Sequence, residues 1–131
     1  MLWTMDHSQG DDTEEMLIGD FARAVGSTKD TVRFYTRLGL LKAGERAAGQ
    51  RHYAVYDQDQ IDRFVFIEQC KALGFTLQEI GSGLREHEAG TLTALRQQEI
   101  MEAKLRSIEE RIASLREAER KLRAKVERSG D

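Results

Sequence analysis

The first regular pattern along the chain is a pair of short amphipathic segments separated by a tight turn. Within residues 16–27, MLIGDFARAVGS, apolar residues recur at helical spacing at Ile18, Phe21, Ala22 and Val25. Gly26 is suited to end this helix. Either Ser27 or Thr28 can cap the next helix, which is expected to run to about Leu38 before Gly39 stops it. Two short helices joined by a glycine-containing turn are typical of a helix-turn-helix.

The pattern changes in residues 42–56, KAGERAAGQRHYAVY. This segment carries two glycines and the β-favouring run His-Tyr-Ala-Val-Tyr, which predicts a short hairpin, or wing. Helical spacing returns in residues 57–75 and ends near Gly74. Thr76 and Glu79 then have the spacing of a capping box, so they predict the start of a fourth, short helix.

From Thr91 onward the chain carries its most regular apolar pattern. Apolar residues alternate at spacings of four and three, which defines the a and d positions of a coiled coil over about four heptads. The seam consists of Met101, Leu105, Ile108, Ile112, Leu115, Leu122 and Val126. Only Glu119 interrupts it. A lone helix cannot bury such a stripe, and no turn residues fold the segment back, so the pattern indicates a homodimer.

These elements predict a mainly α-helical fold, in which a winged helix-turn-helix is followed by a helical linker and a long dimerisation helix. The expected parts are a flexible acidic tail at residues 1–15, a winged domain with linker helices at 16–86, and a coiled-coil helix at 91–128. The chain has 131 residues and no proline, which suits one helical domain with an appendage.

Composition disfavours several other classes of protein. No apolar run approaches about 18 residues, so no membrane span is expected. The N-terminus is acidic and polar, unlike a signal peptide. A single cysteine, Cys70, cannot form an internal disulfide and fits a reducing compartment. We therefore expect a cytoplasmic protein.

The net charge of −3 hides a strong local asymmetry. Residues 1–19 carry five acids and no Lys or Arg, whereas residues 20–53 carry seven Lys or Arg against three acids. Phosphates respond to local charge rather than to the average over the chain. The segment that contains the helix-turn-helix and the wing is therefore expected to bind double-stranded DNA.

The second helix of the helix-turn-helix supplies the candidate chemistry. Such a helix enters the major groove, and Lys29 and Arg33 are four residues apart, so they share a face. Arg33 could pair bidentately with guanine or clamp a phosphate. Phe34 could press on a sugar or a thymine methyl group, and Tyr35 could donate to a phosphate oxygen. The wing would add Arg46, Arg51 and Tyr53 against the flanking backbone, with His52 near a phosphate.

Several motifs occur in a fixed order over residues 16–86. They are Ile18-Gly19, Thr31-Val32-Arg33-Phe34-Tyr35, Gly39-Leu40-Leu41, a wing with Arg and Gly, and Leu73-Gly74-Phe75-x-Leu77-x-x-Ile80. This order resembles the MerR family of bacterial transcription regulators. It is much more specific than a bare helix-turn-helix, and the coiled coil extends the resemblance to nearly the full chain.

The resemblance implies a homodimer with an antiparallel dimerisation coiled coil. Proteins of this family bind promoter palindromes and untwist the spacer between promoter elements for RNA polymerase, so that one dimer can repress or activate. The resemblance also places DNA contacts at Arg33, Phe34 and Tyr35 of the second helix, and at Arg51 and Tyr53 of the wing. Thr31, in the same motif, is a further candidate for DNA binding.

The sequence departs from the family pattern in two places. The family usually has Glu after the tyrosine of the second helix, whereas this chain has Thr36. The wing is about three residues longer than the common form, so either Tyr53 or Tyr56 could be the family's wing tyrosine. We expect Arg51 and Tyr53 to face DNA and Tyr56 to pack in the core.

Cys70 has two readings. It could be a small buried core residue, or it could be a thiol sensor whose pKa is lowered by the neighbouring Lys71. No metal site is expected, because metal sensing in the family needs cysteines at the start of the dimerisation helix and in a C-terminal loop. No cofactor is expected either.

No arrangement of residues indicates an enzyme. The chain has no nucleophile–base pair and no G-x-x-x-x-G-K-[ST] motif. The alternative to a DNA-binding regulator is a protein-interaction module, such as a chaperone modulator or anti-regulator, whose helix-turn-helix docks on protein. The sequence leaves open whether an effector exists.

Overall fold

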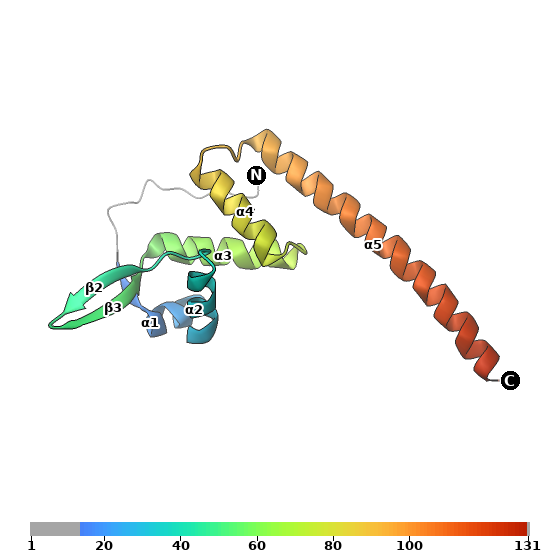
Figure 1. Ribbon diagram of the computed structural model, residues 1–131, viewed down its shortest axis with the longest axis horizontal. Helices are drawn as coiled ribbons and strands as arrows, with labels where there is room; N and C mark the ends of the chain where they lie inside the picture. Colours follow the sequence, from blue (N-terminus) through green and yellow to red (C-terminus); the bar gives the residue numbers. More distant parts are fainter. Residues whose placement is uncertain (1–13, 131) are drawn as a thin grey trace. The chain divides into compact units, whose positions relative to one another are not determined.

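The computed structural model describes residues 14–130, and its backbone divides into two compact units at Leu92 and Thr93. The first unit contains β1 (Met16–Leu17), α1 (Ile18–Ala24), α2 (Lys29–Arg37), β2 (Gly44–Ala48), β3 (Arg51–Tyr56), α3 (Gln58–Ala72) and α4 (Leu77–Glu88). The second unit is the single helix α5 (Ala94–Ser129). Figure 1 labels these elements. The predicted winged helix-turn-helix with a long C-terminal helix is confirmed.

The helix-turn-helix is formed by α1 and α2. Of the two candidate caps, Thr28 caps α2, because its hydroxyl accepts from the backbone N–H of Thr31 at 3.2 Å. At the other end of α2, Gly39 has φ +79°, a left-handed conformation that glycine adopts without strain. The turn then brings the N–H of Leu40 to the carbonyl of Tyr35 at 2.9 Å.

The wing is the antiparallel hairpin of β2 and β3, as predicted from residues 42–56. A third strand, which the sequence pattern did not predict, completes the sheet in the order β1-β3-β2. Met16 and Leu17 pair with Tyr56 and Val55, so α1 begins only at Ile18. The two residues are extended because β3 offers them backbone hydrogen bonds, a partner that local periodicity cannot reveal.

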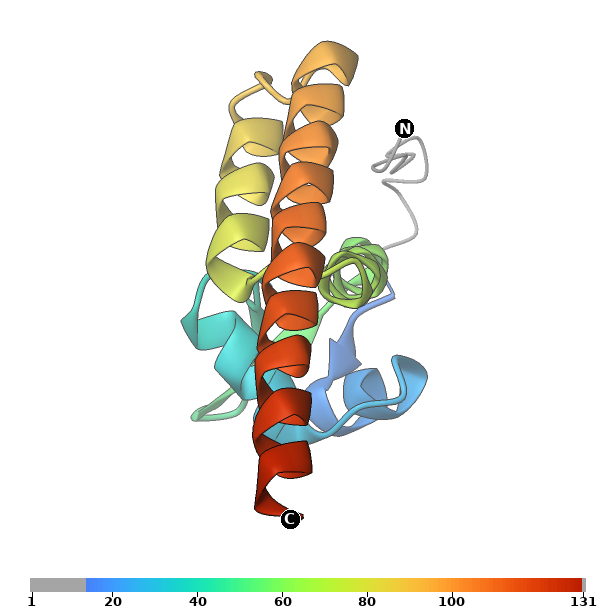
Figure 2. The same cartoon turned by 90° about the vertical axis from the view of Figure 1, so that its right-hand side faces the viewer.

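The core of the first unit lies where α1, α2, the base of the wing, α3 and α4 meet. In both cartoon views α1 and α2 lie on the same side of α3, which Figure 2 shows nearly end on. Phe21 stacks on Tyr56 at a centroid distance of 4.8 Å and meets Phe64 edge-on at 6.3 Å. Tyr35 lies 5.5 Å from Phe64 on the other side. Burial of these aromatic rings is the main stabilising contribution to the unit.

A buried polar cluster ties the segment after α2 to α3 and α4. Arg63 is buried, and its Nε donates to the carbonyl of Leu40 at 2.7 Å while its Nη2 donates to Oε1 of Glu88 at 2.6 Å. Lys42 reaches the same carboxylate at 3.0 Å, and its backbone N–H donates to Gln60 at 2.8 Å. Hydrogen bonds from Arg63 and Lys42 lower the pKa of Glu88. This cluster fixes the exit of α2 against the linker helices.

The linker helices begin as the sequence predicts. Asp57 caps α3, and Thr76 with Glu79 forms a complete capping box at the start of α4. α3 ends at Ala72, just before Gly74, as expected.

Helix α5 is continuous over the predicted coiled-coil segment and is capped by Thr93, which accepts from the N–H of Arg96. From Leu105 to Val126 the large residues of the predicted seam are exposed, with Val126 at 69%. Residues 14–130 therefore leave this part of the stripe uncovered. None of the helices in the described part is long and apolar enough to span a membrane. Residues 1–13 of the predicted tail lie outside the described residues, and Glu14 and Glu15 are exposed.

Candidate DNA interface

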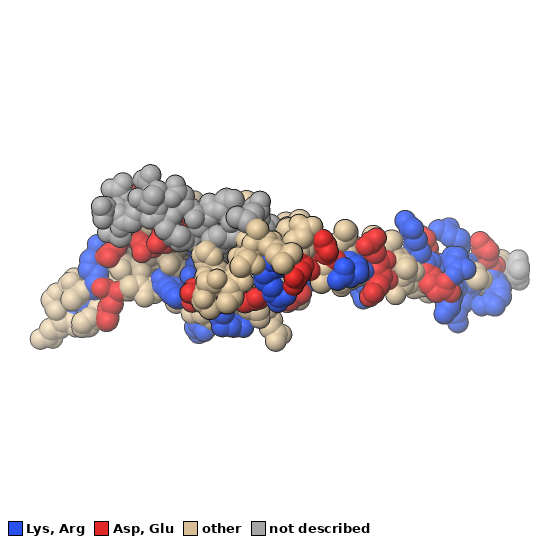
Figure 3. All heavy atoms as spheres, turned by 90° about the horizontal axis from the view of Figure 1, so that it is seen from above, with Lys and Arg blue, Asp and Glu red and all other residues tan. Residues whose placement is uncertain are grey.

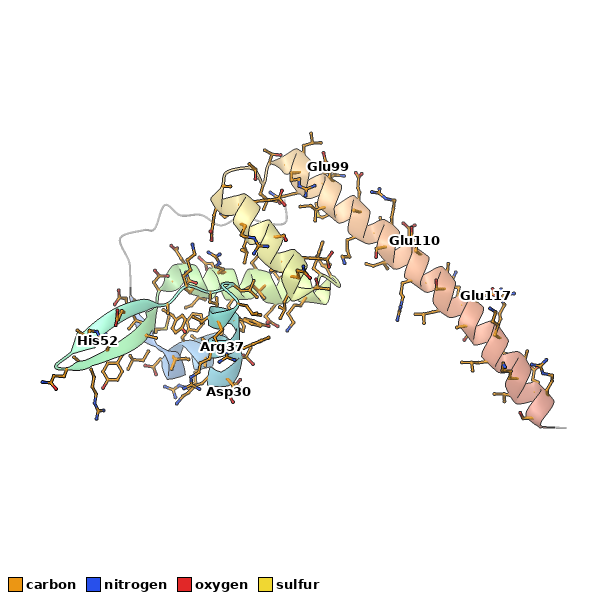
Figure 4. All side chains as sticks on the ribbon, in the orientation of Figure 1. Asp30, Arg37, His52, Glu99, Glu110 and Glu117 are labelled. Atoms are coloured by element: carbon orange, nitrogen blue, oxygen red, sulfur yellow. The ribbon has the colours of Figure 1, made fainter. Side chains whose placement is uncertain are left out.

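One face of α2 is basic and open. Lys29, Arg33 and Arg37 follow one another at spacings of four residues, so they form a row along the helix, and all three are exposed. Arg37 was not among the predicted contacts, although its spacing from Arg33 would have found it. Figure 4 labels Arg37 at the end of this helix and Asp30 near its start.

Arg33 and Phe34 are the residues of α2 best placed to meet a ligand. Among residues 14–130, the guanidinium of Arg33 forms an ion pair only with Asp30, at 3.2 Å, and the side chain of Asp30 is 96% exposed. Exposed ion pairs contribute little, so a phosphate or a guanine could take the place of Asp30. The ring of Phe34 is 42% exposed. Thr31 is half-buried and belongs to the cap, because its N–H and hydroxyl both contact the hydroxyl of Thr28.

The side chain of Lys29, at the start of α2, lies against Gly19 of α1. A Cβ built at Gly19 would lie 3.2 Å from Cε of Lys29, closer than an ordinary van der Waals contact. Gly19 therefore leaves room for the aliphatic part of Lys29. A larger residue at position 19 would displace the side chain of Lys29 from α1.

The wing brings its three predicted residues onto one face. Residues paired across an antiparallel hairpin point to the same side, and Arg46 pairs with Tyr53 while Ala48 pairs with Arg51. Successive residues alternate, so Arg46, Arg51 and Tyr53 share the face that carries the buried Val55. Tyr53 is 38% exposed.

His52 differs from the sequence prediction. It lies on the opposite face of the wing, where its Nδ1 is 3.0 Å from a carboxylate oxygen of Glu45. Figure 4 labels His52 on the hairpin. An acidic neighbour on that face repels a phosphate, so His52 is not part of the candidate interface.

Tyr35 also requires a correction. The sequence predicted that Tyr35 contacts a phosphate, but the side chain of Tyr35 is only 2% exposed. Its hydroxyl donates to Glu68 at 2.9 Å and accepts from Lys71 at 2.9 Å, and burial raises the pKa of Tyr35. Tyr35 therefore holds α2 on α3 and does not face the solvent. Its spacing of three from the buried Val32 was the signal that could have shown this.

Tyr56 packs in the core, as expected. It stacks on Phe21, and its hydroxyl is 2.9 Å from the hydroxyl of Thr36. Thr36 is the residue that departs from the family pattern, and here it joins the recognition helix to the base of the wing. Its hydroxyl also lies 2.7 Å from the carbonyl of Val32, one turn earlier in α2.

The environment of Cys70 contradicts the reading as a thiol sensor. Its side chain is 3% exposed, and burial raises its pKa to about 11. Lys71 does not offset this burial, since its ammonium group donates to Tyr35. The thiolate is the reactive form of cysteine, so Cys70 is a protonated core residue at neutral pH.

The chain is similar to known proteins over most of its length. Residues 16–86 match the family model described as MerR HTH family regulatory protein, and residues 61–125 match the model MerR, DNA binding. The chain belongs to the MerR family, and it is a DNA-binding transcription regulator. The predicted resemblance is thereby confirmed.

Two relatives illustrate the similarity. The mercuric resistance operon regulatory protein of Bacillus cereus is 34% identical over 105 residues, covering 80% of this chain and 78% of the relative. The ZntR homolog of Haemophilus influenzae, an HTH-type transcriptional regulator, is 30% identical over 107 residues, covering 82% of this chain and 78% of the relative.

Solved structures agree on the fold. The transcription regulator PbrR691 from Ralstonia metallidurans CH34, in complex with lead(II), superposes with a TM-score of 0.72 at 30% identity, covering 82% of each chain. HiNmlR, a MerR family regulator lacking the sensor domain and bound to promoter DNA, superposes with a TM-score of 0.56 at 22% identity. That match covers 78% of this chain and 76% of HiNmlR, and it concerns the fold alone.

Proposed function

We propose that this regulator binds a palindromic promoter site as a homodimer. The observation that carries the proposal is the row of Lys29, Arg33 and Arg37 on the open face of α2. A helix of this kind fits the major groove, where arginine recognises guanine and lysine neutralises phosphates. In this account Arg33 and Phe34 read base edges, while Lys29 and Arg37 hold the backbone.

The wing contributes contacts outside the major groove. Arg46, Arg51 and Tyr53 share one face, so they approach the flanking backbone together. Residues 16–86 are thus the DNA-binding part, and 91–128 are the dimerisation part. The exposed stripe on α5 supports this division, since a second copy offers an equal stripe to cover it.

Control of transcription follows from the family. Regulators of this type distort the spacer between promoter elements, and we propose that the dimer does so here for RNA polymerase in the bacterial cytoplasm. The match of residues 16–86 and 61–125 to the two MerR family models supports the DNA-binding half of this proposal. The alternative of a protein-docking module has no observation in its favour.

We do not extend the metal responses of the relatives to this chain. PbrR691 is known with lead(II), a soft metal that prefers thiolate ligands. The chain's single cysteine, Cys70, is buried and protonated. Among residues 14–130 no three His, Cys, Asp or Glu gather in a way that could hold a metal ion. Any effector is therefore expected to be of another kind.

A gel shift on the upstream region of the protein's own gene tests the proposal. The wild-type protein should shift this DNA, and Arg33→Ala should weaken binding by about tenfold or more, because a bidentate arginine contact contributes about 1–3 kcal/mol. Arg106→Ala, an exposed arginine of α5, is the matched control and should bind like wild type. Absence of binding by the wild-type protein to any upstream fragment would favour the protein-docking alternative.

A further inference from the structure

The residues that flank the apolar stripe of α5 carry an ordered charge pattern. Counting Leu105 and Ile112 as a positions, the e positions are Glu102, Glu109, Arg116 and Arg123. The first two are acidic and the last two are basic. Figure 3 shows both signs along the helix, with basic side chains more abundant toward its C-terminal end.

This pattern is complementary to itself in only one orientation. In an antiparallel pair, e positions face e positions of the other helix, and the N-terminal half of one helix lies against the C-terminal half of the other. Glu109 then faces Arg116 of the second copy, and Glu102 faces its Arg123. In a parallel pair a g position faces the next e position instead, which places Lys104 against Glu109 but Arg111 against Arg116 of the second copy, so attraction and repulsion offset each other.

The same pairs also fix the register. When Glu109 faces Arg116, the apolar seam aligns Ile112 with Leu115 of the second copy. Two further apolar layers then follow, Leu105 with Leu122 and Met101 with Val126. A shift by one heptad in either direction places Glu109 against Glu109, or Arg116 against Arg116. The stated register has four pairs of opposite charge at the e positions, whereas each shifted register has two pairs of opposite charge and one pair of like charge, so both shifted registers are less favourable.

We propose that the charges at 102, 109, 116 and 123 select self-pairing of α5 in this one antiparallel register and disfavour other partners. The inference rests on the proposed homodimer and deepens it by defining which residues meet.

The surroundings of the four residues are compatible with this role. Within the described part of the chain, Glu109 and Arg116 have no ion-pair partner, so both are available to a second helix. On the opposite flank Arg111 would face Ala118, and Lys104 would face Lys125, a pair of like charges that offsets part of the attraction between the e positions. The orientation is therefore determined by the e positions.

The charged residue of the seam is compatible with the register as well. Glu119 would face Ile108 of the second copy. It is paired within its own helix to Arg123 at 3.6 Å. In the dimer Arg123 would lie between this carboxylate and Glu102 of the second copy, so both acids would share its charge.

Site-specific cross-linking of the full-length protein tests the register. Glu109→Cys and Arg116→Cys are prepared separately in a Cys70→Ala background, and a short bis-maleimide is added to each variant and to their mixture. The register predicts cross-linked dimers only in the mixture. Cross-linking of Glu109→Cys with itself, or of Arg116→Cys with itself, would overturn the register.

Light scattering of the wild-type protein separates the register from the homodimer. A monomer would refute the homodimer, whereas a dimer with the wrong cross-link would refute only the register.

A charge exchange tests the selection. The acidic variant carries Arg116→Glu and Arg123→Glu, and the basic variant carries Glu102→Arg and Glu109→Arg. Each alone should dimerise about tenfold or more weakly than wild type, since several pairs become repulsive. Their equimolar mixture should form heterodimers, detected by native mass spectrometry. Acids near the start and bases near the end of a helix also favour its macrodipole. The macrodipole alone predicts that mixing the acidic and basic variants does not restore dimerisation. If the mixture fails to dimerise, the proposal is therefore wrong.

Discussion

The hydroxyl of Thr36 in α2 lies 2.9 Å from the hydroxyl of Tyr56 in β3, and this contact joins the recognition helix to the wing. Tyr56 is in turn stacked on Phe21 of α1. The spacing between the two parts of the proposed DNA interface therefore depends on one residue that is half-buried, Thr36, and one that is buried, Tyr56.

Removal of this contact is expected to weaken DNA binding through the wing. Thr36→Val keeps the branched shape and removes the hydroxyl, which should cost about 1 kcal/mol, or roughly fivefold in affinity. The measurement is a double-mutant cycle with Arg51→Ala by fluorescence anisotropy. If Thr36 positions the wing, its substitution should matter much less once Arg51 is absent. Additive effects, or a loss of affinity explained by unfolding in a thermal melt, would contradict this role.

Release of Arg33 from its neighbour is expected to strengthen binding. Asp30 is an exposed acid 3.2 Å from the Arg33 guanidinium, on the face offered to DNA. Asp30→Asn removes both the competing pair and a charge that repels phosphates, so affinity should rise by about threefold at low salt. Glu110→Gln, which removes an exposed acid from α5, serves as the control and should change nothing. Equal effects of the two variants would show that only net charge matters.

Tyr35→Phe separates a structural role from a DNA contact. The substitution keeps the buried ring and removes the hydroxyl that joins Glu68 and Lys71. We expect a loss of about 1 kcal/mol in the free energy of unfolding, measured with urea, because one buried hydrogen-bond network is broken. Affinity for DNA should stay unchanged at temperatures where the variant is folded. A lower affinity with a smaller salt dependence would instead restore the phosphate contact expected from the sequence.

The carboxylate of Glu88 is expected to make stability depend on pH. Arg63 and Lys42 lower the pKa of Glu88 in the folded protein below its usual value of 4.5. The ionised form is thus favoured by folding, and its contribution is complete above about pH 4.5 and disappears as the pH falls through the lowered pKa. Urea unfolding should show wild type more stable than Glu88→Gln at neutral pH, with the difference shrinking in acid. A difference that is constant with pH would contradict this assignment.

The sequence was most informative where structure depends on neighbours along the chain. The Thr76–Glu79 capping box, the hairpin over 42–56 and the helix under the coiled-coil seam are all local patterns, and each is present. The exposed face of α2 was also partly accessible, since Arg33 and Lys29 share a helical spacing.

The features that the sequence could not show depend on contacts between residues that are far apart along the chain. The spacing of Tyr35 from Val32 could indicate that Tyr35 is buried, but no local pattern reveals its partners Glu68 and Phe64. Met16 and Leu17 form a strand because β3 is adjacent in space. Arg33, Phe34 and Tyr35 belong to one sequence motif, and all three were predicted to contact DNA. On a helix, however, residues one or two positions apart point in different directions.

The most direct test of the central claim is a hydroxyl-radical footprint on the upstream region of the gene. The account predicts two protected patches about one helical turn of DNA, or a multiple of it, apart, because two copies of α2 enter successive major grooves. Arg33→Ala should abolish both patches together, while Arg106→Ala should leave them intact. A single patch, or a footprint that survives Arg33→Ala, would contradict recognition of a palindrome through α2.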